Sequence, residues 1–147
     1  MIVDIKIKKL HKDAIVPEVA SKYSAGADLY ALLEEEILIQ PHTTQLVPTG
    51  IAVELPYATV GLIYARSGIA SKRGLAPANK VGVIDSDYRG EILVALHNHS
   101  DKPQKVSPGE RIAQLVVMPY YTPNFILSEE LSDTARGEGG FGSTGTK

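Results

Sequence analysis

The chain has 147 residues, a formal net charge of −2 and no cysteine. This length amounts to one domain, which can bury about 70% of its unfolded surface in an ordinary core. The absence of cysteine excludes disulfides and thiolate metal sites. The small negative net charge argues against non-specific binding to nucleic acid. No apolar run is long enough to span a bilayer, and the N-terminal residues 1–4 lack the basic-then-apolar pattern of a secretion signal. We therefore expect a soluble, cytoplasmic protein with no membrane or nucleic-acid partner.

Short β-strands are predicted along most of the chain. Val3, Ile5 and Ile7 alternate with polar residues, which is the pattern of a half-buried strand. Further strands are predicted from β-rich runs at 37–39, 43–47, 51–55, 60–64, 81–84, 92–96 and 112–118. Phe125, within an apolar stretch, is predicted to be a core residue. Many short strands with frequent turns indicate an all-β fold, namely a sandwich, jelly roll or barrel.

Residues 67–74 depart from the pattern of short strands and predict a single short helix. Ser67 is a suitable N-cap, cations occupy the expected last turn, and Gly74 is a suitable stop. A helix that starts at Ser67 offers free N–H groups to an anion, and Arg66 adds a forked cation suited to phosphate oxygens. A capped helix beside a solvated arginine explains the same residues and is the commoner arrangement.

The segment 85–90 is rich in turn residues and lies between two predicted strands. We expect residues 81–84 to pair with residues 92–95 as a hairpin. A nucleobase could lie against exposed main-chain groups there. Asp85 directly follows the apolar run 81–84. Its carboxylate is therefore the one expected to be partly desolvated, as a general base should be. An ordinary Asp/Gly turn is the alternative interpretation.

Two further features are weaker when read alone. His97 and His99 share one face of a predicted strand, but two histidines without a third ligand rarely form a metal site, so we interpret them as polar strand-end residues. Asp28 is an isolated carboxylate beside a glycine, which favours a structural turn.

The C-terminal residues 132–147 have almost nothing to bury and are predicted to be a mobile tail after a β domain at 1–131. Arg136 and hydroxyl groups on this glycine-rich ribbon suit phosphate binding, and Phe141 could stack on a base. Ordering roughly a dozen residues costs on the order of 10 kcal/mol, so the tail should close only over a ligand. A disordered end without function is the alternative.

Taken in order, five blocks of the chain resemble the trimeric dUTP pyrophosphatase family. The third and fifth blocks are highly specific, whereas the first means little alone. Ala65 stands where the family often has proline, and Ala27 where it often has a bulkier residue, but neither departure removes a functional side chain. The five blocks are residues 25–29, 65–70, 82–90, 109–115 and 136–145.

The resemblance implies a jelly-roll-like subunit with one short helix and a flexible glycine-rich tail, in a homotrimer with active sites between subunits. It implies Mg²⁺-assisted hydrolysis of dUTP to dUMP and pyrophosphate, which limits uracil in DNA and supplies dUMP for dTMP synthesis. Asp85 would activate the water that attacks the α-phosphorus, Arg136 would act as an arginine finger, and Asp28 would hold Mg²⁺ through a water.

The resemblance also assigns the residues that would bind the substrate. The groups that would hold the phosphates are Arg66, Ser67, Gly68, Gln114, Arg136, Gly142, Ser143 and Thr144. The groups that would hold the nucleoside are Asn79, Tyr88, Phe141 and the main chain of Val83, Ile84 and Leu93.

Two rival functions stay open at the level of the sequence. A dCTP deaminase shares this fold, although we would not expect it to carry the full ribbon at 136–144. A nucleotide-sensing regulator could keep the fold and lose turnover, although the retention of Asp85, Gln114 and Arg136 argues against it.

Overall fold

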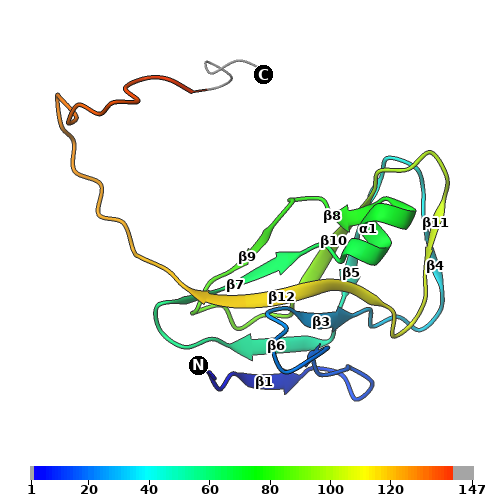
Figure 1. The fold of residues 1–147 in the computed structure, drawn as a ribbon. Coiled ribbons are helices and arrows are strands. Elements are labelled where there is room, and N and C mark those ends of the chain that lie inside the picture. The colour runs from blue at the N-terminus through cyan, green and yellow to red at the C-terminus, as the bar shows by residue number, and fades with distance from the viewer. Residues whose placement is uncertain (1, 141–147) are drawn as a thin grey trace.

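The computed structural model of the protein describes residues 2–140 (Figure 1). These residues form one helix, α1 (Ser67–Arg73), and twelve short strands. The strands are β1 (Lys6–Lys9), β2 (Glu18–Val19), β3 (Ala27–Tyr30), β4 (Ile37–Ile39), β5 (Thr44–Pro48), β6 (Ile51–Glu54), β7 (Thr59–Tyr64), β8 (Leu75–Pro77), β9 (Gly82–Ile84), β10 (Leu93–Asn98), β11 (Gln104–Val106) and β12 (Arg111–Pro119).

The strands pair antiparallel in four sheets. The largest has the order β2-β3-β12-β7-β9, a second has the order β5-β10-β8, and two pairs are β1-β6 and β4-β11. Many neighbours are far apart in the chain, as expected of a jelly-roll-like fold. Fully buried side chains from both larger sheets, among them Leu29, Val47, Leu96 and Ile112, pack into one core. The predicted all-β class is confirmed.

The predicted hairpin between residues 81–84 and 92–95 is wrong. Strand β9 pairs with β7, with Gly82 opposite Ile63, while β10 pairs with β5 and β8. The hairpin would need an edge of β10 that is already paired with strand β8. This pairing continues to the hydrogen bond from the Ala78 N–H to the Ala95 carbonyl, at 2.7 Å. Beyond that bond β9 and β10 diverge, which leaves two strand edges facing a hollow.

The helix lies at the predicted place but begins differently. Gly74 ends it with φ of 69°, and its N–H bonds the last carbonyls, as predicted. The N-cap, however, is Arg66 and not Ser67, and no side chain caps the first turn. The chain stays extended through Arg66 after leaving β7 and turns into the helix directly afterwards. The Arg66 side chain is therefore available for other contacts.

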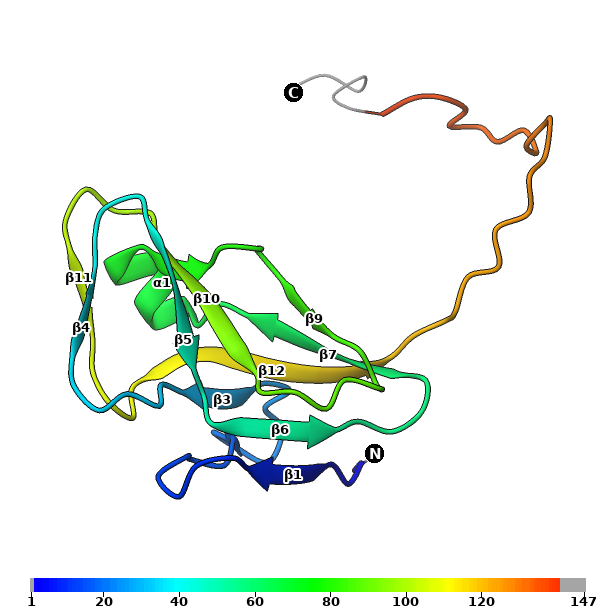
Figure 2. The same ribbon diagram turned by 180° about the vertical axis from the view of Figure 1, so that it is seen from behind.

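After β12 ends at Pro119, the chain leaves the sandwich as an extended arm (Figures 1 and 2). The prediction that Phe125 lies in the core is wrong, because 91% of it is exposed, and Ile126 and Leu127 are exposed beside it. The sandwich is already closed by other strands, so this apolar stretch has no partner within the described chain. The predicted ligand groups Phe141, Gly142, Ser143 and Thr144 lie outside the described residues.

Candidate active site

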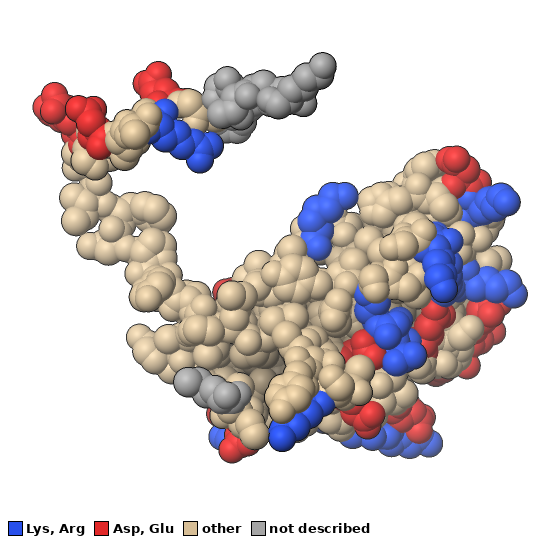
Figure 3. All heavy atoms as spheres, in the orientation of Figure 1, with Lys and Arg blue, Asp and Glu red and all other residues tan. Residues whose placement is uncertain are grey.

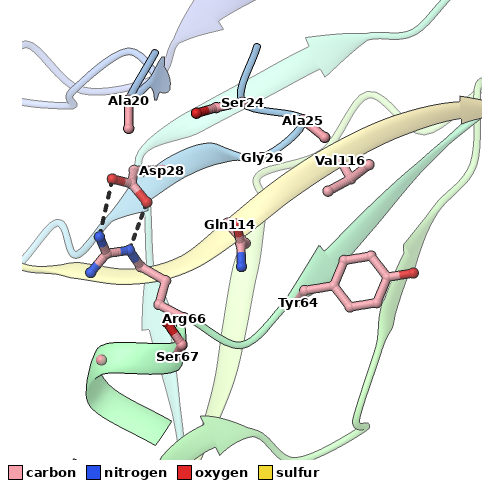
Figure 4. Close-up of a pocket in the computed structure, with 11 residues that line it drawn as sticks. Ala20, Ser24, Ala25, Gly26, Asp28, Tyr64, Arg66, Ser67, Gln114 and Val116 are labelled. Atoms are coloured by element: carbon pink, nitrogen blue, oxygen red, sulfur yellow. Dashed lines mark hydrogen bonds and ion pairs between the residues drawn. The ribbon is translucent and has the colours of Figure 1, made fainter.

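A first hollow, of about 580 Å³, lies where the turn before β3 meets the end of β7 and the middle of β12 (Figure 4). Five predicted site residues line it, contributed by β3, α1, β12 and the short connection between β7 and α1. They are Asp28, Arg66, Ser67, Gly68 and Gln114. The structure thus brings together every predicted phosphate-binding residue of the sandwich itself.

Asp28 holds Arg66 in place in this hollow. The residue is only 9% exposed, and its carboxylate accepts hydrogen bonds from Arg66 Nε at 2.6 Å and Nη2 at 3.3 Å. A third bond comes from Arg111 Nη1 at 3.2 Å. Two arginines compensate the charge of the buried carboxylate, and the fork of Arg66 is oriented by a two-point contact. Arg111 was not among the predicted site residues, although it lies in the same family-like block as Gln114.

Gln114 is positioned by contacts on two sides. Its Nε2 donates to the Ala65 carbonyl at 2.8 Å. On the other side it lies so close to Gly26 that a Cβ there would stand 2.2 Å from Gln114 Oε1. Gly26 is therefore required by close packing, a role that the sequence alone did not indicate.

A second hollow lies between the diverging edges of β9 and β10. It is lined by the predicted nucleoside residues and the predicted base, and it continues as a further small hollow toward Pro77 and Ala95. In Figure 3 the surface over β7 and β9 is largely uncharged. The predicted residues that line the two connected hollows are Asn79, Val83, Ile84, Asp85, Tyr88 and Leu93.

The turn between β9 and β10 is held by its own hydrogen bonds. The Tyr88 hydroxyl donates to the Glu91 carbonyl at 2.8 Å, and the Tyr88 N–H donates to the Asp85 carbonyl at 3.1 Å. A Cβ on Gly90 would stand 2.4 Å from the Tyr88 hydroxyl, so only glycine lets the ring cross the turn. The Glu91 carboxylate accepts the Gly50 N–H at 2.8 Å and ties the turn to the sandwich. The ring of Tyr88 is thereby preorganised.

Asp85 differs from its expected environment. Its side chain is exposed and has no hydrogen-bond partner within residues 2–140, whereas the sequence predicted partial desolvation. The free carboxylate can accept a proton from a water, but its desolvation must come from a ligand or a second copy of the chain.

The two hollows share no lining residue. Arg136 contacts neither of them, since it lies on the arm and its Nε bonds the Gly139 carbonyl at 2.7 Å. On a single chain the predicted site is therefore split into three parts: the phosphate-type hollow, the nucleoside-type hollow and the arm.

The part of the chain that the structure describes contains no group of three or more His, Asp or Glu that could cage a metal ion. Three of the roughly four acceptor positions on the Asp28 carboxylate are occupied by arginine N–H groups.

The one described helix has seven residues, too few to cross a bilayer.

One hollow presents a forked cation and an amide, and the other presents bare strand edges and an aromatic ring. These two sets of groups suit a nucleotide-binding protein. Comparisons with known proteins make this specific. The family model for dUTPase matches residues 12–145. A deoxyuridine 5'-triphosphate nucleotidohydrolase of Desulfitobacterium hafniense is 51% identical over 146 residues, covering 97% of both chains. One from Clostridioides difficile is 46% identical over 142 residues, covering 97% of this chain and 98% of the relative. The chain belongs to the dUTPase family.

Solved structures agree with this assignment. The dUTPase of Staphylococcus bacteriophage 80alpha with dUPNHPP has a TM-score of 0.88 and 32% identity, covering 97% of this chain and 98% of that chain. A mutant dUTPase from phage phi11 of S. aureus, which coordinates a structural Mg(II) ion, has a TM-score of 0.76 and 27% identity, covering 87% of this chain and 98% of that chain.

Proposed function

We propose that the protein hydrolyses dUTP to dUMP and pyrophosphate, and so limits uracil in DNA and supplies dUMP for dTMP synthesis. The observation that carries the proposal is the sorting of the predicted residues. In a chain of the dUTPase family, those suited to phosphate line one hollow and those suited to a nucleoside line the other.

In the first hollow, Arg66, Ser67 and Gln114 bind the phosphates. The guanidinium supplies positive charge and paired N–H donors to phosphate oxygens, and the Asp28 contact keeps its fork in one orientation. Gln114 adds an amide whose position is set by Ala65 and Gly26. Because these groups are ordered without ligand, little further ordering is needed on binding.

In the second hollow, the main chain of Val83, Ile84 and Leu93 and the amide of Asn79 read the edge of uracil. Cytosine leaves buried polar groups of this site unpaired, which is a strong basis for rejection. The exclusion of thymine is proposed to be steric, since a main chain close to C5 of the base would admit no methyl group. The ring of Tyr88 lies against the deoxyribose and excludes a 2′-hydroxyl.

Asp85 takes a proton from the water that attacks the α-phosphorus. Its carboxylate has no hydrogen-bond partner within residues 2–140, and bound substrate shields it from bulk water. Arg136, with Phe141, Gly142, Ser143 and Thr144, reaches this site from the tail. Arg136 neutralises charge that develops on the phosphates, and Phe141 stacks on the uracil ring.

The working assembly is a homotrimer with active sites between subunits. Two observations support it: the two hollows have no residue in common, and the apolar arm residues Phe125, Ile126 and Leu127 are exposed on the single chain. A neighbouring copy completes the site and removes the arm from water. The domain ends near residue 131, and the tail at 132–147 closes over bound substrate.

Mg²⁺ fits this site as an ion that arrives with the triphosphate. The described residues lack an acidic cage, and Mg²⁺ characteristically keeps waters and takes phosphate oxygens directly. Asp28 retains one acceptor position with which to hold it through a water. When bound, the ion supplies neutralisation of the triphosphate charge.

A pyrophosphate-release assay with dUTP, dTTP, dCTP and UTP, each with and without Mg²⁺, tests the proposal. We expect strong preference for dUTP and dependence on Mg²⁺. Release of ammonia from dCTP would instead identify a deaminase, and tight dUTP binding without any turnover would identify a regulator.

A further inference from the structure

The first hollow is formally neutral when only the side chains that line it are counted. Asp28 carries one negative charge and Arg66 one positive charge, and the other lining residues are uncharged. Figure 4 draws the contacts between these two side chains as dashed lines at the wall of the hollow. A neutral lining is a poor receptor for a triphosphate, because a multiply charged anion is attracted by an excess of positive charge. The proposed phosphate binding therefore requires a further cation close to this pair.

Arg111 supplies this cation from outside the hollow. It is absent from the lining residues, but its Nη1 lies 3.2 Å from Asp28 Oδ2. The side chain of Asp28 is 12% exposed and that of Arg111 is 53% exposed, so a buried carboxylate is paired with an arginine that extends into solvent. Among residues 2–140, Asp28 is the acid with which Arg111 forms an ion pair. Together with Arg66, the cluster has two cations and one anion, and its net charge is positive.

A β-bulge brings Arg111 to this carboxylate. Arg111 and Gln114 are three positions apart on β12, and in a regular strand they would point to opposite faces. The pairing of β12 with β3 shifts register between Arg111 and Ala113, and Ile112 and Ala113 are both fully buried. The extra residue turns Arg111 to the face on which Gln114 lies directly opposite Asp28. Without the bulge Arg111 would point into the core.

Arg66 keeps free donors while it is held by Asp28. Its Nε and Nη2 each donate one N–H to the carboxylate, and its remaining N–H groups make no hydrogen bond within residues 2–140. The longer of these two contacts, at 3.3 Å, falls on Oδ2, which Arg111 also contacts. The two arginines thus share the charge of one carboxylate. Asp28 therefore orients Arg66 without fully neutralising it.

We propose that Arg111 is a positioning residue for phosphate binding: it compensates Asp28, so that Asp28 can orient Arg66 while the positive charge of Arg66 remains available to the triphosphate. The inference rests on the phosphate-binding role of the first hollow in the proposed function, and it names the residue that sets the charge of that hollow. Arg111 acts through Asp28 and does not itself contact substrate. Without Arg111, the other two side chains form a neutral pair, and the hollow attracts phosphates less strongly.

Calorimetric titration with a non-hydrolysable dUTP analogue at saturating Mg²⁺ tests this role. We expect Arg111→Gln to bind the analogue about tenfold more weakly than the parent, because a positive charge is lost beside the phosphates. Arg111→Lys should restore most of the affinity, since a contact through a single nitrogen needs the charge and not the fork. Parent-like binding by Arg111→Gln, or a failure of Arg111→Lys to restore the affinity, would overturn the proposal.

Lys105→Gln is the matched control for the change in net charge. It removes one cation from an exposed ion pair, with Glu36 at 2.8 Å, and Lys105 does not line the first hollow. We expect it to bind the analogue as the parent does. A loss equal to that of Arg111→Gln would show an effect of overall charge and would overturn the specific role of Arg111.

A double-mutant cycle with Asp28→Asn separates a role through Asp28 from a direct contact with phosphate. Once the carboxylate is an amide, Arg111 has no negative charge to compensate, and its half-exposed side chain loses the acid that holds it beside the hollow. We therefore expect Arg111→Gln to change the affinity by about twofold or less in the Asp28→Asn background. An undiminished loss there would overturn the positioning role, because a substrate contact or a general loosening of the sheet acts in either background.

Inorganic tripolyphosphate as a second probe keeps the test independent of the base. A parent that binds tripolyphosphate but not the dUTP analogue would contradict the proposed function, and the same cycle titrated with tripolyphosphate would still decide the role of Arg111. A parent that binds neither probe would overturn both the phosphate-binding hollow and the role of Arg111.

Discussion

At the scale of single residues, the site depends on side chains that are fixed before substrate arrives. Arg66 is held by Asp28, Gln114 by Ala65, and the Tyr88 ring by the Glu91 carbonyl. Asp85 is the exception, since its carboxylate is exposed and unpaired among the described residues. A base must be free to take a proton, whereas binding groups benefit from preorganisation.

Asp85→Asn tests the proposed base. The amide has nearly the same shape but cannot accept the proton of the attacking water, so we expect kcat to fall by about 10²- to 10⁴-fold. Calorimetric titration with a non-hydrolysable dUTP analogue should show binding within a few-fold of the parent. Near-normal kcat would remove Asp85 from the mechanism.

Gly26→Ala tests the close packing against Gln114. The new Cβ would collide with Gln114 Oε1 and displace the side chain from its bond to Ala65, so we expect a loss of about 1 kcal/mol in unfolding free energy and a raised KM. Gly68→Ala is the control in the same hollow, because a Cβ there meets nothing within 4 Å. Urea unfolding of both variants measures the difference, and equal stabilities would contradict the packing argument.

At the scale of elements, the ends and edges of strands position the side chains of the proposed site. The site groups come from the end of β7, the middle of β12, and the edges of β9 and β10. The arm after β12 is the one element without a partner in the described chain, and it bears both apolar residues and Arg136. Its role is therefore expected in the assembly and not in the folding of the sandwich.

Ending the chain after Asp133 tests this separation of roles. We expect the truncated protein to keep its β-structure and its trimeric state. Its activity should fall by at least about 10³-fold, because the arginine on the tail is removed. Circular dichroism, light scattering and the pyrophosphate assay measure the three properties. A chain that ends after Gly145, where the family match ends, is the control and should remain active. Full activity of the shorter protein would refute the role of the tail.

At the scale of the whole molecule, the separation of the two hollows on one chain leads us to expect that activity is a property of the proposed homotrimer. The phosphate-type hollow and the nucleoside-type hollow have separate linings. Defects in the two hollows should therefore complement each other when different chains are combined in one trimer.

Co-expression of Arg66→Ala with Asp85→Asn tests this expectation. Each variant alone should be nearly inactive, but random mixed trimers contain sites with both residues intact, so we expect up to about a quarter of the parent activity. The control mixes the two purified proteins at low temperature immediately before the assay, when chains have had no time to exchange. Co-expressed material no more active than this mixture would place both residues in one self-contained site.

The sequence alone was sufficient for the all-β class, the position of the short helix and the family, and it named part of the set of residues that line the two hollows. These features are local or written in contiguous motifs: alternation of apolar residues, a glycine stop, and blocks such as residues 82–90. It could not give strand partners. The hairpin prediction failed because β8 and β7 compete for the edges of β10 and β9, a non-local choice that no local pattern encodes.

Tertiary structure also decided what each side chain contacts. Only folding brings Arg111 and Arg66 to one carboxylate, places Gly26 against Gln114, and leaves Phe125 outside the sandwich. Local sequence determines which backbone states and which faces are favourable, because propensity and periodicity act over a few residues. Packing across distant segments determines which charges are compensated and which apolar side chains remain exposed.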